Sequence, residues 1–443
     1  MLLGGVADWE SLSVEAHRAY AGKIEVLVRV PVESPRDLSL WYTPGVAGPA
    51  RRILENPDES FELTWRWNTV AVVSDGSRVL GLGDVGAEAA LPVMEGKALL
   101  FKLLGGVDAI PIVVRERDAG RLAYIVKSLE PSFGGVNLED VESPKCFWLL
   151  EELEKTLRIP VWHDDQQGTA LVVIAGLLNA LKLVGKKLSS SKIVLFGAGA
   201  SNIGTYRYLK ALGASPKRIV VIDSRGVLRP SREDAAEMAR SNPWKYRVAL
   251  ETDPVEERLE DAFGGADVLI AASRPGPGVV KKEWVRLMAD NAIVFALANP
   301  TPEIWPWEAR EAGARVVATG RSDLPNQINN SLGFPAVFRG ALSARATRIT
   351  DSMVIAAAEA LAAYTEETGL SENRIVPSML ESEAYVREAL AVAVRALEEG
   401  VARRRLSRSE LEREIRELVE RPRRVAAALS SRGLAVGHGG ERV

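Results

Sequence analysis

Two adjacent carboxylates, Asp164 and Asp165, stand where an apolar run ends and a long apolar helix is expected to begin. The run extends from Ile159 to His163, and the expected helix spans Ala170 to Val184. Neighbouring side chains at a strand end point to opposite sides, so one carboxylate can face a metal or substrate while the other faces a second partner. A helix N-terminus also favours anionic groups. The alternative is that both carboxylates only cap the helix together with Thr169, and this stretch alone does not decide between the two.

Three further features of the first third could carry chemistry. Glu139 and Asp140 form a second vicinal acidic pair, for which an acidic surface turn is the alternative. Lys97 lies near the start of an amphipathic helix expected over 94–104, where the helix dipole disfavours a cation, and a solvated lysine is the alternative. Tyr42 directly precedes an expected helix, in a loop where a phenol can face a cleft. Taken alone, Tyr42 is better interpreted as a core aromatic.

Beyond these residues, the order strand, glycine-rich turn, helix, strand and acidic residue is typical of a dinucleotide-binding fold. The strands are expected at 192–196 and 218–222, the helix at 205–212, and Asp223 ends the second strand. Glycines let the backbone approach the pyrophosphate, and Asp223 can accept hydrogen bonds from the adenosine ribose. The turn residues expected to bind the cofactor are Gly197, Ala198, Gly199, Ala200, Ser201 and Asn202.

Two departures leave details of this pattern open. Asn202 occupies the place of the third glycine and Gly204 follows two residues later, which puts the packing of the helix in question. Asp223 favours NAD by repelling a 2′-phosphate, whereas Arg225 could accept one. The sequence therefore predicts NAD or NADP without choosing between them.

The predicted fold class is α/β, with a mixed α/β N-terminal domain over 1–158 and a doubly wound Rossmann-type domain over 159–443 that includes C-terminal helices. Strands of the first domain are expected at 69–73, 109–115 and 124–129, and further strands of the second at 267–271, 292–296 and 315–318. Ligands bind at the carboxyl ends of parallel strands, which places Asn299, Asn329 and Asn330 near the nucleotide and its substrate.

Composition narrows the class of protein. A net charge of −3 over 443 residues argues against nucleic-acid binding, because phosphate contacts need a concentrated basic face. The single cysteine, Cys146, excludes an intrachain disulfide and fits a reducing, cytoplasmic compartment. Three histidines do not suggest a zinc site, so a metal held by carboxylates, magnesium or manganese, is expected. Residues 1–13 lack the pattern of a signal peptide, and the longest apolar run, 171–184, is too short and polar for a membrane span.

With these residues in view, the chain resembles the malic enzymes of the short bacterial and archaeal form, over roughly Val14 to Thr365. Several separate motifs carry the resemblance, which makes chance agreement improbable. They are Tyr42-Thr-Pro-Gly-Val-Ala, Val79-Leu-Gly-Leu-Gly-Asp-Val-Gly, Met94-Glu-Gly-Lys97, Asn137-Leu-Glu-Asp140, His163-Asp-Asp-Gln-Gln-Gly-Thr169, Phe295-Ala-Leu-Ala-Asn-Pro300 and Ala318-Thr-Gly-Arg-Ser-Asp-Leu-Pro-Asn-Gln-Ile-Asn-Asn330.

The resemblance implies oxidative decarboxylation of L-malate to pyruvate and carbon dioxide, with NAD or NADP reduced and Mn²⁺ or Mg²⁺ bound, and also decarboxylation of oxaloacetate. It implies a homodimer or higher homo-oligomer. By matching position, Lys97 is the general base, Tyr42 the general acid and Asp164 the acid beside the lysine. The metal ligands are Glu139, Asp140 and Asp165. Malate is expected to contact Arg78, Lys97, Asn299, Asn329 and Asn330, and the cofactor also Thr169, Asp223, Arg225 and Asn299.

Three rival functions remain at this point. A malolactic-type reaction at the same site would give lactate without accumulating reduced cofactor. An amino-acid dehydrogenase shares the two-domain layout but would not need the three acidic metal ligands, so activity in chelator separates it. A nucleotide-binding sensor could dispense with Lys97 or Tyr42 and would show no turnover.

Overall fold

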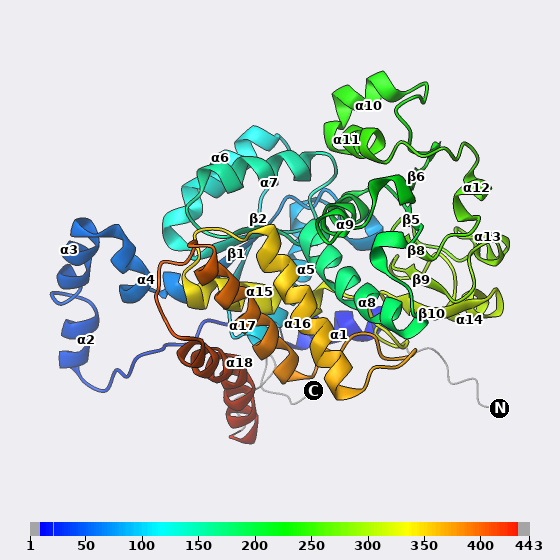
Figure 1. Cartoon of the computed structure of the whole chain (residues 1–443). Helices are drawn as coiled ribbons and strands as arrows, with labels where there is room; N and C mark the ends of the chain where they lie inside the picture. Colours follow the sequence, from blue (N-terminus) through cyan, green and yellow to red (C-terminus); the bar gives the residue numbers. More distant parts are fainter. Residues whose placement is uncertain (1–8, 21, 433–443) are drawn as a thin grey trace.

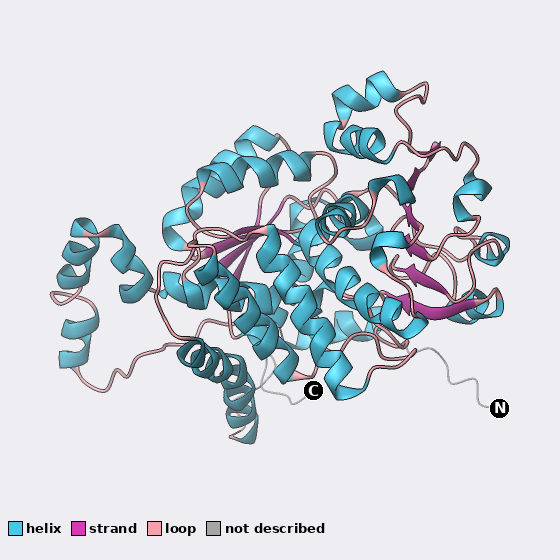
Figure 2. Ribbon diagram, in the orientation of Figure 1, coloured by secondary structure: helices cyan, strands magenta, loops and turns pink. Residues whose placement is uncertain are grey.

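The computed structural model describes residues 9–20 and 22–432. Residues 1–8, most of the segment expected not to be a signal peptide, lie outside the described residues, as does His438. Two separate β-sheets, each covered by helices, organise the chain (Figures 1 and 2). The predicted α/β class is confirmed.

The first sheet has four parallel strands in the order β2-β1-β3-β4. Its strands are β1 (Thr69–Ser74), β2 (Asp108–Val113), β3 (Gly135–Leu138) and β4 (Val161–His163). All six residues of β1 are buried, as a central strand of a parallel sheet requires, and its sequence is accordingly almost continuously apolar. Because β4 pairs with β3, this sheet extends past residue 158, where we expected the division between the domains; that division stays a prediction.

Helices α5 (Gly86–Gly105), α6 (Ala119–Leu129) and α7 (Lys145–Thr156) accompany the first sheet. The expected strand at 124–129 is wrong, because this stretch is the second half of α6. Asp118 caps α6 by accepting from the backbone N–H of Arg121, and Leu122 and Val126, four residues apart, are buried. The period of the stretch is therefore helical.

The second sheet has six strands in the order β10-β9-β8-β5-β6-β7. The strands are β5 (Ile193–Phe196), β6 (Ile219–Asp223), β7 (Gly226–Val227), β8 (Val268–Ala271), β9 (Ala292–Ala296) and β10 (Ala314–Thr319). All are parallel except β7, which forms a short antiparallel pair with β6. The order reverses between β5 and β8, so this is a doubly wound sheet with a switch point there, where a dinucleotide fold binds its ligand. Its helices are α9 (Ala200–Ala211), α10 (Ala235–Ser241), α11 (Pro243–Thr252), α12 (Leu259–Phe263), α13 (Lys282–Arg286) and α14 (Pro306–Glu311).

Helix α8 (Thr169–Val184) lies between the two sheets (Figure 1). The main hydrophobic cluster includes residues of the first sheet, of α8 and of the second sheet, so one core joins both units. By length and composition alone, the stretch Asp164–Val184 could cross a membrane, so the expectation that this region is too short and too polar for a span is wrong. However, 72% of its most apolar 18-residue window is buried inside the protein. It therefore has the features of a core helix.

The C-terminal quarter is helical, with α15 (Phe334–Ala344), α16 (Asp351–Gly369), α17 (Ser382–Glu398) and α18 (Arg408–Ser431). Helices α15, α17 and α18 pack against one another and against α5, while α16 packs against α8. The C-terminal helices thus complete the covering of the first unit as well as that of α8.

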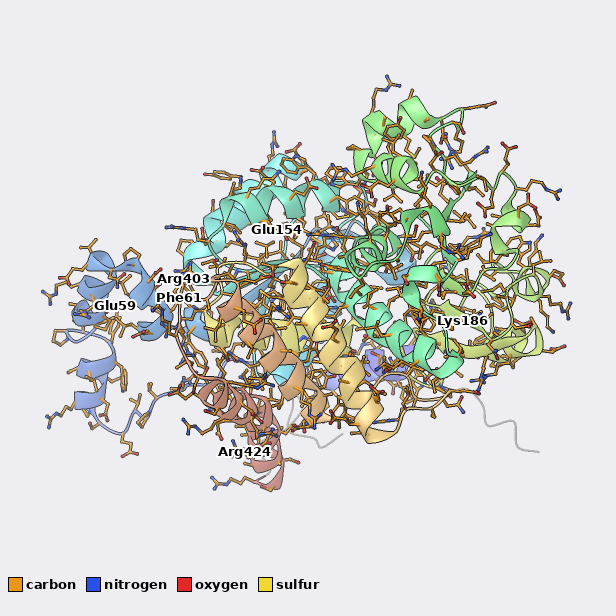
Figure 3. All side chains as sticks on the ribbon, viewed as in Figure 1. Glu59, Phe61, Glu154, Lys186, Arg403 and Arg424 are labelled. Atoms are coloured by element: carbon orange, nitrogen blue, oxygen red, sulfur yellow. The ribbon has the colours of Figure 1, made fainter. Side chains whose placement is uncertain are left out.

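The N-terminal segment lies on the surface of this body, where Lys23 donates to the carbonyl of Pro92 in α5 and the guanidinium carbon of Arg29 lies 4.9 Å from the ring of Trp67. Helix α1 (Trp9–Tyr20), an extended stretch over 23–33, α2 (Pro35–Trp41) and α3 (Ala47–Glu55) contain no buried residue among those described. We call 23–55 the arm; its helices α2 and α3 project to one side in Figure 1. Helix α4 (Ser60–Leu63) forms the root of the arm, where buried Phe61 lies 5.1 Å from the guanidinium carbon of Arg403 (Figure 3).

Candidate active site

A buried lysine and two acidic side chains meet at the carboxyl end of the first sheet. The Nζ of Lys97 lies 2.5 Å from Oδ2 of Asp164 and 2.9 Å from Oε1 of Glu139. All three residues are buried, and the ring of Phe334 covers the ammonium group at 4.3 Å. Helix α5 begins at Gly86 rather than near Met94, so Lys97 lies in the middle of the helix and the expected conflict with the helix dipole is wrong.

Charge controls the protonation of this cluster. Burial lowers the pKa of Lys97, but the carboxylates of Asp164 and Glu139 outweigh it and the net pKa is raised. Burial raises the pKa of Glu139, opposed by Lys97, with the other acidic groups adding to the rise. The pKa of Asp165 is raised by burial too, although Lys97 and the nearby Arg78 oppose this. The positive charges of Lys97 and Arg78 are therefore too few to balance the carboxylates of this cluster.

Glu139, Asp140 and Asp165 form a set of the kind that holds a divalent cation. One carboxylate oxygen from each lies within 4.8 Å of the others. Asp140 has φ 54°, and its backbone N–H donates to Oδ2 of Asp165 at 3.1 Å, which ties the end of β3 to the turn after β4. Three clustered acidic oxygens suit magnesium or manganese, and a cation there would relieve their shared repulsion.

Asp164 and Asp165 lie in a wide helical turn, Asp164–Gly168, that precedes α8. No side-chain hydrogen bond caps α8, so the alternative in which these carboxylates only cap the helix is wrong. Oδ1 of Asp164 accepts from Nε1 of Trp162 at 2.9 Å, which leaves Oδ2 for Lys97. A Cβ on Gly168 would lie 1.9 Å from Oδ1 of Asp164, so only glycine leaves room for this carboxylate.

The expected substrate residues are partly gathered around this turn. A Cβ on Gly168 would lie 3.3 Å from Cβ of Asn330, which places Asn330 beside Asp164. The side chain of Asn329 instead accepts from the backbone N–H of Ser331 at 3.0 Å. Arg78 is exposed, its backbone N–H donates to the carbonyl of Asp140, and its charge acts on Asp165.

Tyr42 is not brought to Lys97 within the described chain. Its side chain is 73% exposed, at the end of α2 in the projecting arm, so the interpretation as a core aromatic is wrong. The helix expected to start at Pro44 starts at Ala47.

The expected nucleotide turn connects β5 to α9. Gly197 has φ 107°, and a Cβ there would lie 2.3 Å from the carbonyl of Ala272. Asn202 donates from Nδ2 to the carbonyls of Phe196, Gly197 and Ile270 at 3.2, 2.9 and 3.3 Å. Asn202 therefore ties the turn to β8 instead of loosening the helix.

Gly204 supplies the close packing expected of a glycine in this pattern. A Cβ on Gly204 would lie 2.5 Å from the carbonyl of Gln166, in the turn that carries Asp164 and Asp165. Thr169 begins α8 directly after this turn. The nucleotide helix and the acidic turn are thus in direct contact.

Asp223 already has a full set of partners. Oδ1 accepts from the backbone N–H of Arg225 at 2.8 Å and from Arg232 at 2.8 Å, while Oδ2 accepts from Arg232 at 3.0 Å and contacts Lys245. Burial raises the pKa of Asp223, but these cationic and backbone donors outweigh it and lower the net pKa. Sequence reasoning missed Arg232 and Lys245, which no fixed spacing links to Asp223.

Together, the doubly wound sheet with its glycine turn and the acidic cluster beside a buried lysine are typical of a nucleotide-dependent oxidoreductase. Family models agree: one described as the malic enzyme NAD-binding domain matches residues 166–399, and one described as the malic enzyme N-terminal domain matches 21–122. The chain belongs to the malic enzyme family.

Several curated relatives are similar over most of their length. A bifunctional malic/malolactic enzyme of Bacillus subtilis is 47% identical, over 92% of this chain and 97% of that one. An NAD-dependent malic enzyme of Geobacillus stearothermophilus is 49% identical (86% and 78% covered), and an NADP-dependent malic enzyme of Halomonas elongata 44% (86% and 92%).

Solved structures are similar as well. The malic enzyme of Entamoeba histolytica superposes with a TM-score of 0.93 at 43% identity, covering 98% of this chain and 90% of that one. The malic enzyme of Pyrococcus horikoshii has a TM-score of 0.90 at 49% identity, covering 96% and 98%.

Proposed function

We propose that this enzyme converts L-malate to pyruvate and carbon dioxide while reducing NAD or NADP, with Mn²⁺ or Mg²⁺ held by Glu139, Asp140 and Asp165. The observation that carries the proposal is the buried pair of Lys97 and Asp164 directly beside those three carboxylates. When bound, the metal supplies Lewis-acid stabilisation of negative charge on the substrate and the nicotinamide supplies a hydride acceptor. Oxaloacetate, which needs only the decarboxylation half of this chemistry, is a second substrate.

Lys97 takes the proton of the C2 hydroxyl. It is held protonated by Asp164 and Glu139, so it needs a reason to release its proton. Glu139 would be engaged as a ligand when the metal is bound, which would withdraw one of the two carboxylates that raise the pKa of Lys97 and so lower that pKa. Asp164, held by Trp162, keeps Nζ in place through the transfer and stabilises the positive charge that Lys97 gains with the proton.

Tyr42 protonates C3 of the enol of pyruvate, and it does so in the site of a second copy of the chain. The arm that carries it exposes apolar side chains, with Val26 at 83% and Val28 at 81%, and its stretch over 23–33 is extended without a strand partner. Exposed apolar surface of this kind is typical of an interface. The active unit is therefore a homodimer or a multiple of it.

Arg78, whose charge acts on Asp165, and Asn330, which lies beside Gly168, orient the malate carboxylates. Asn299, at the carboxyl end of β9, contacts both cofactor and substrate. The side-chain oxygen of Asn329 already accepts a hydrogen bond from the backbone N–H of Ser331. Of the two asparagines, Asn330 is therefore favoured as the substrate contact.

Both NAD and NADP are accepted. Four donors occupy the oxygens of Asp223, and Arg232 and Lys245 offset its charge, so its repulsion of a 2′-phosphate is weakened. Arg225, whose side chain is half-exposed and pairs with Asp234 and Glu237, would have to exchange these partners for such a phosphate. The relatives named NAD-dependent and NADP-dependent are almost equally similar to this chain. The single cysteine supports a reducing compartment, and we place the enzyme in the cytoplasm.

A malolactic reaction is the second candidate, because a relative 47% identical over 92% of this chain is named a bifunctional malic/malolactic enzyme. The deciding experiment follows reduced nicotinamide by absorbance with L-malate, Mn²⁺ and either cofactor, together with pyruvate and lactate. Equal amounts of reduced cofactor and pyruvate, abolished by EDTA, establish oxidative decarboxylation. Lactate without reduced cofactor identifies the malolactic reaction, and no turnover with either cofactor refutes both.

A further inference from the structure

Glu303 is a buried carboxylate that joins two loops at the edge of the expected cofactor crevice. It is fully buried. Oε1 accepts from the backbone N–H of Ser273 at 2.8 Å and from its hydroxyl at 3.0 Å, while Oε2 accepts from the backbone N–H of Ala298 at 3.1 Å. Ser273 follows β8 and Ala298 follows β9, so one side chain bridges the ends of two adjacent parallel strands.

The two bridged loops lie where the second unit meets the loop before α5. Ala298 directly precedes Asn299, and a Cβ on Gly320 would lie 2.6 Å from Nδ2 of Asn299, so this side chain is held against the end of β10. Gly81, from the loop before α5, packs against both loops: a Cβ there would lie 2.9 Å from the carbonyl of Asn299 and 3.4 Å from Pro275. Glu303 thus joins the two loops through which the two units of the protein make contact.

The free-energy cost of burying the Glu303 carboxylate indicates that this residue fixes the geometry of the two loops. No cation pairs with Glu303 among the described residues, and its partners are neutral donors. Burial raises its pKa, although the hydrogen bonds from Ser273 and Ala298 oppose the rise. Burying a carboxylate without a counter-charge costs free energy, so a glutamate here contributes more to fixing the two backbone N–H groups than to overall stability.

We propose that Glu303 is a positioning residue that fixes Asn299 and the loop after β8 in the orientation in which they receive the cofactor and malate. This inference rests on the proposed function for the malate part only. Because Glu303 acts through Asn299 and the 273–276 loop, its loss weakens binding more than it slows the chemical step.

The test is Glu303→Gln, which keeps the shape but turns one acceptor into an N–H₂ group. That group then faces a backbone N–H of Ser273 or Ala298, so one loop is released. The matched control is Glu388→Gln in α17, the same change at a buried carboxyl whose two oxygens have no hydrogen-bond partner among the described residues. Calorimetry with NAD⁺ and NADP⁺, without malate, and steady-state kinetics are measured for wild type and both variants.

We expect Glu303→Gln to raise the Kd for the cofactor and the KM for malate about tenfold, with kcat changed less and the melting temperature nearly unchanged. Glu388→Gln leaves Kd and KM at wild-type values. Unchanged Kd and KM in Glu303→Gln would overturn the proposal, and so would a collapse in melting temperature with all parameters lost together in Glu303→Gln and in the second variant, Glu303→Asp. Failure of the wild type to oxidise malate would refute the proposed function instead, since cofactor binding still tests Glu303.

Discussion

Nζ of Lys97 and Oδ2 of Asp164 lie 2.5 Å apart although 67 residues separate them in the chain. The pair joins α5 to the turn after β4. Asp164→Asn keeps the hydrogen-bond acceptor but removes the charge, and we expect kcat to fall by about 10²–10⁴. Asp108→Asn is the matched control, because Asp108 also lies 2.5 Å from a lysine of α5, Lys102, but both are partly exposed. A similar kcat loss in both variants would show that the Lys97 pair has no special role.

Gly168→Ala is expected to displace Asp164, since the added Cβ would lie 1.9 Å from its Oδ1. Activity should fall by at least about a hundredfold with a small change in secondary structure, measured by kinetics and circular dichroism. Gly96→Ala, in α5 with nothing within 4 Å of the new Cβ, should retain activity and gain about 0.5–1 kcal/mol of stability. Full activity in Gly168→Ala would show that catalysis does not require the observed position of the Asp164 carboxylate.

Mn²⁺ should raise the melting temperature of the protein without substrate, because it binds only where Glu139, Asp140 and Asp165 are gathered. A hundredfold excess over Kd corresponds to about 2.7 kcal/mol. Asp165→Asn should abolish the shift, while Asp84→Asn, at an exposed carboxylate, should keep it. An equal shift in both variants would place the ion elsewhere.

Co-expressed Tyr42→Phe and Lys97→Ala chains should recover activity that neither has alone. If Tyr42 serves the site of its partner, each mixed dimer has one site with both residues, and the mixture reaches about a quarter of wild-type activity. Lys97→Ala with Asp164→Asn is the control and should recover none, because both residues belong to the same chain's site. If the first pair recovers no activity, Tyr42 either acts in the site of its own chain or takes no part in the mechanism.

Glu154 predicts a pH dependence of stability. Burial raises its pKa from 4.5 to about 7, although Arg207 opposes this; it lies on α7 (Figure 3). Because the folded pKa exceeds the unfolded one, the folded state binds more protons between these values, and stability falls as pH rises through this window. Glu154→Gln should therefore gain stability relative to wild type between pH 5 and 8, by about 1–2 kcal/mol in denaturant titrations. Glu152→Gln, whose carboxylate pairs with Lys127, should show no such gain.

Much of the fold is predictable from the sequence, because the signals for its strands and turns lie in neighbouring residues. The apolar runs of β1 and β5 and the glycine turn after β5 were recognisable from neighbouring residues. The stretch at 124–129 was mistaken for a strand because its helical period becomes visible only when Leu122 and the cap at Asp118 are included.

The candidate site was predictable through its motifs but not through its contacts. The vicinal pairs Glu139–Asp140 and Asp164–Asp165 stand out in the sequence, and the structure brings them together. Two partners were not predictable in this way. Trp162 donates a hydrogen bond to Asp164, and Arg232 donates two to Asp223, but no motif spacing indicates these contacts. The projection of the arm with Tyr42 was equally invisible, because an apolar stretch has the same composition whether it meets its own core or another chain.

The contact between Gly204 and the carbonyl of Gln166 has a thermodynamic consequence. The nucleotide helix α9 rests on the same turn that carries Asp165, a proposed metal ligand, and Asp164, the partner of Lys97. Whatever a dinucleotide gains or loses by shifting that turn, the cation must gain or lose by the same factor, since linkage between two binding equilibria is reciprocal. The affinity for the cofactor and the affinity for the metal are thus expected to be coupled through one five-residue turn.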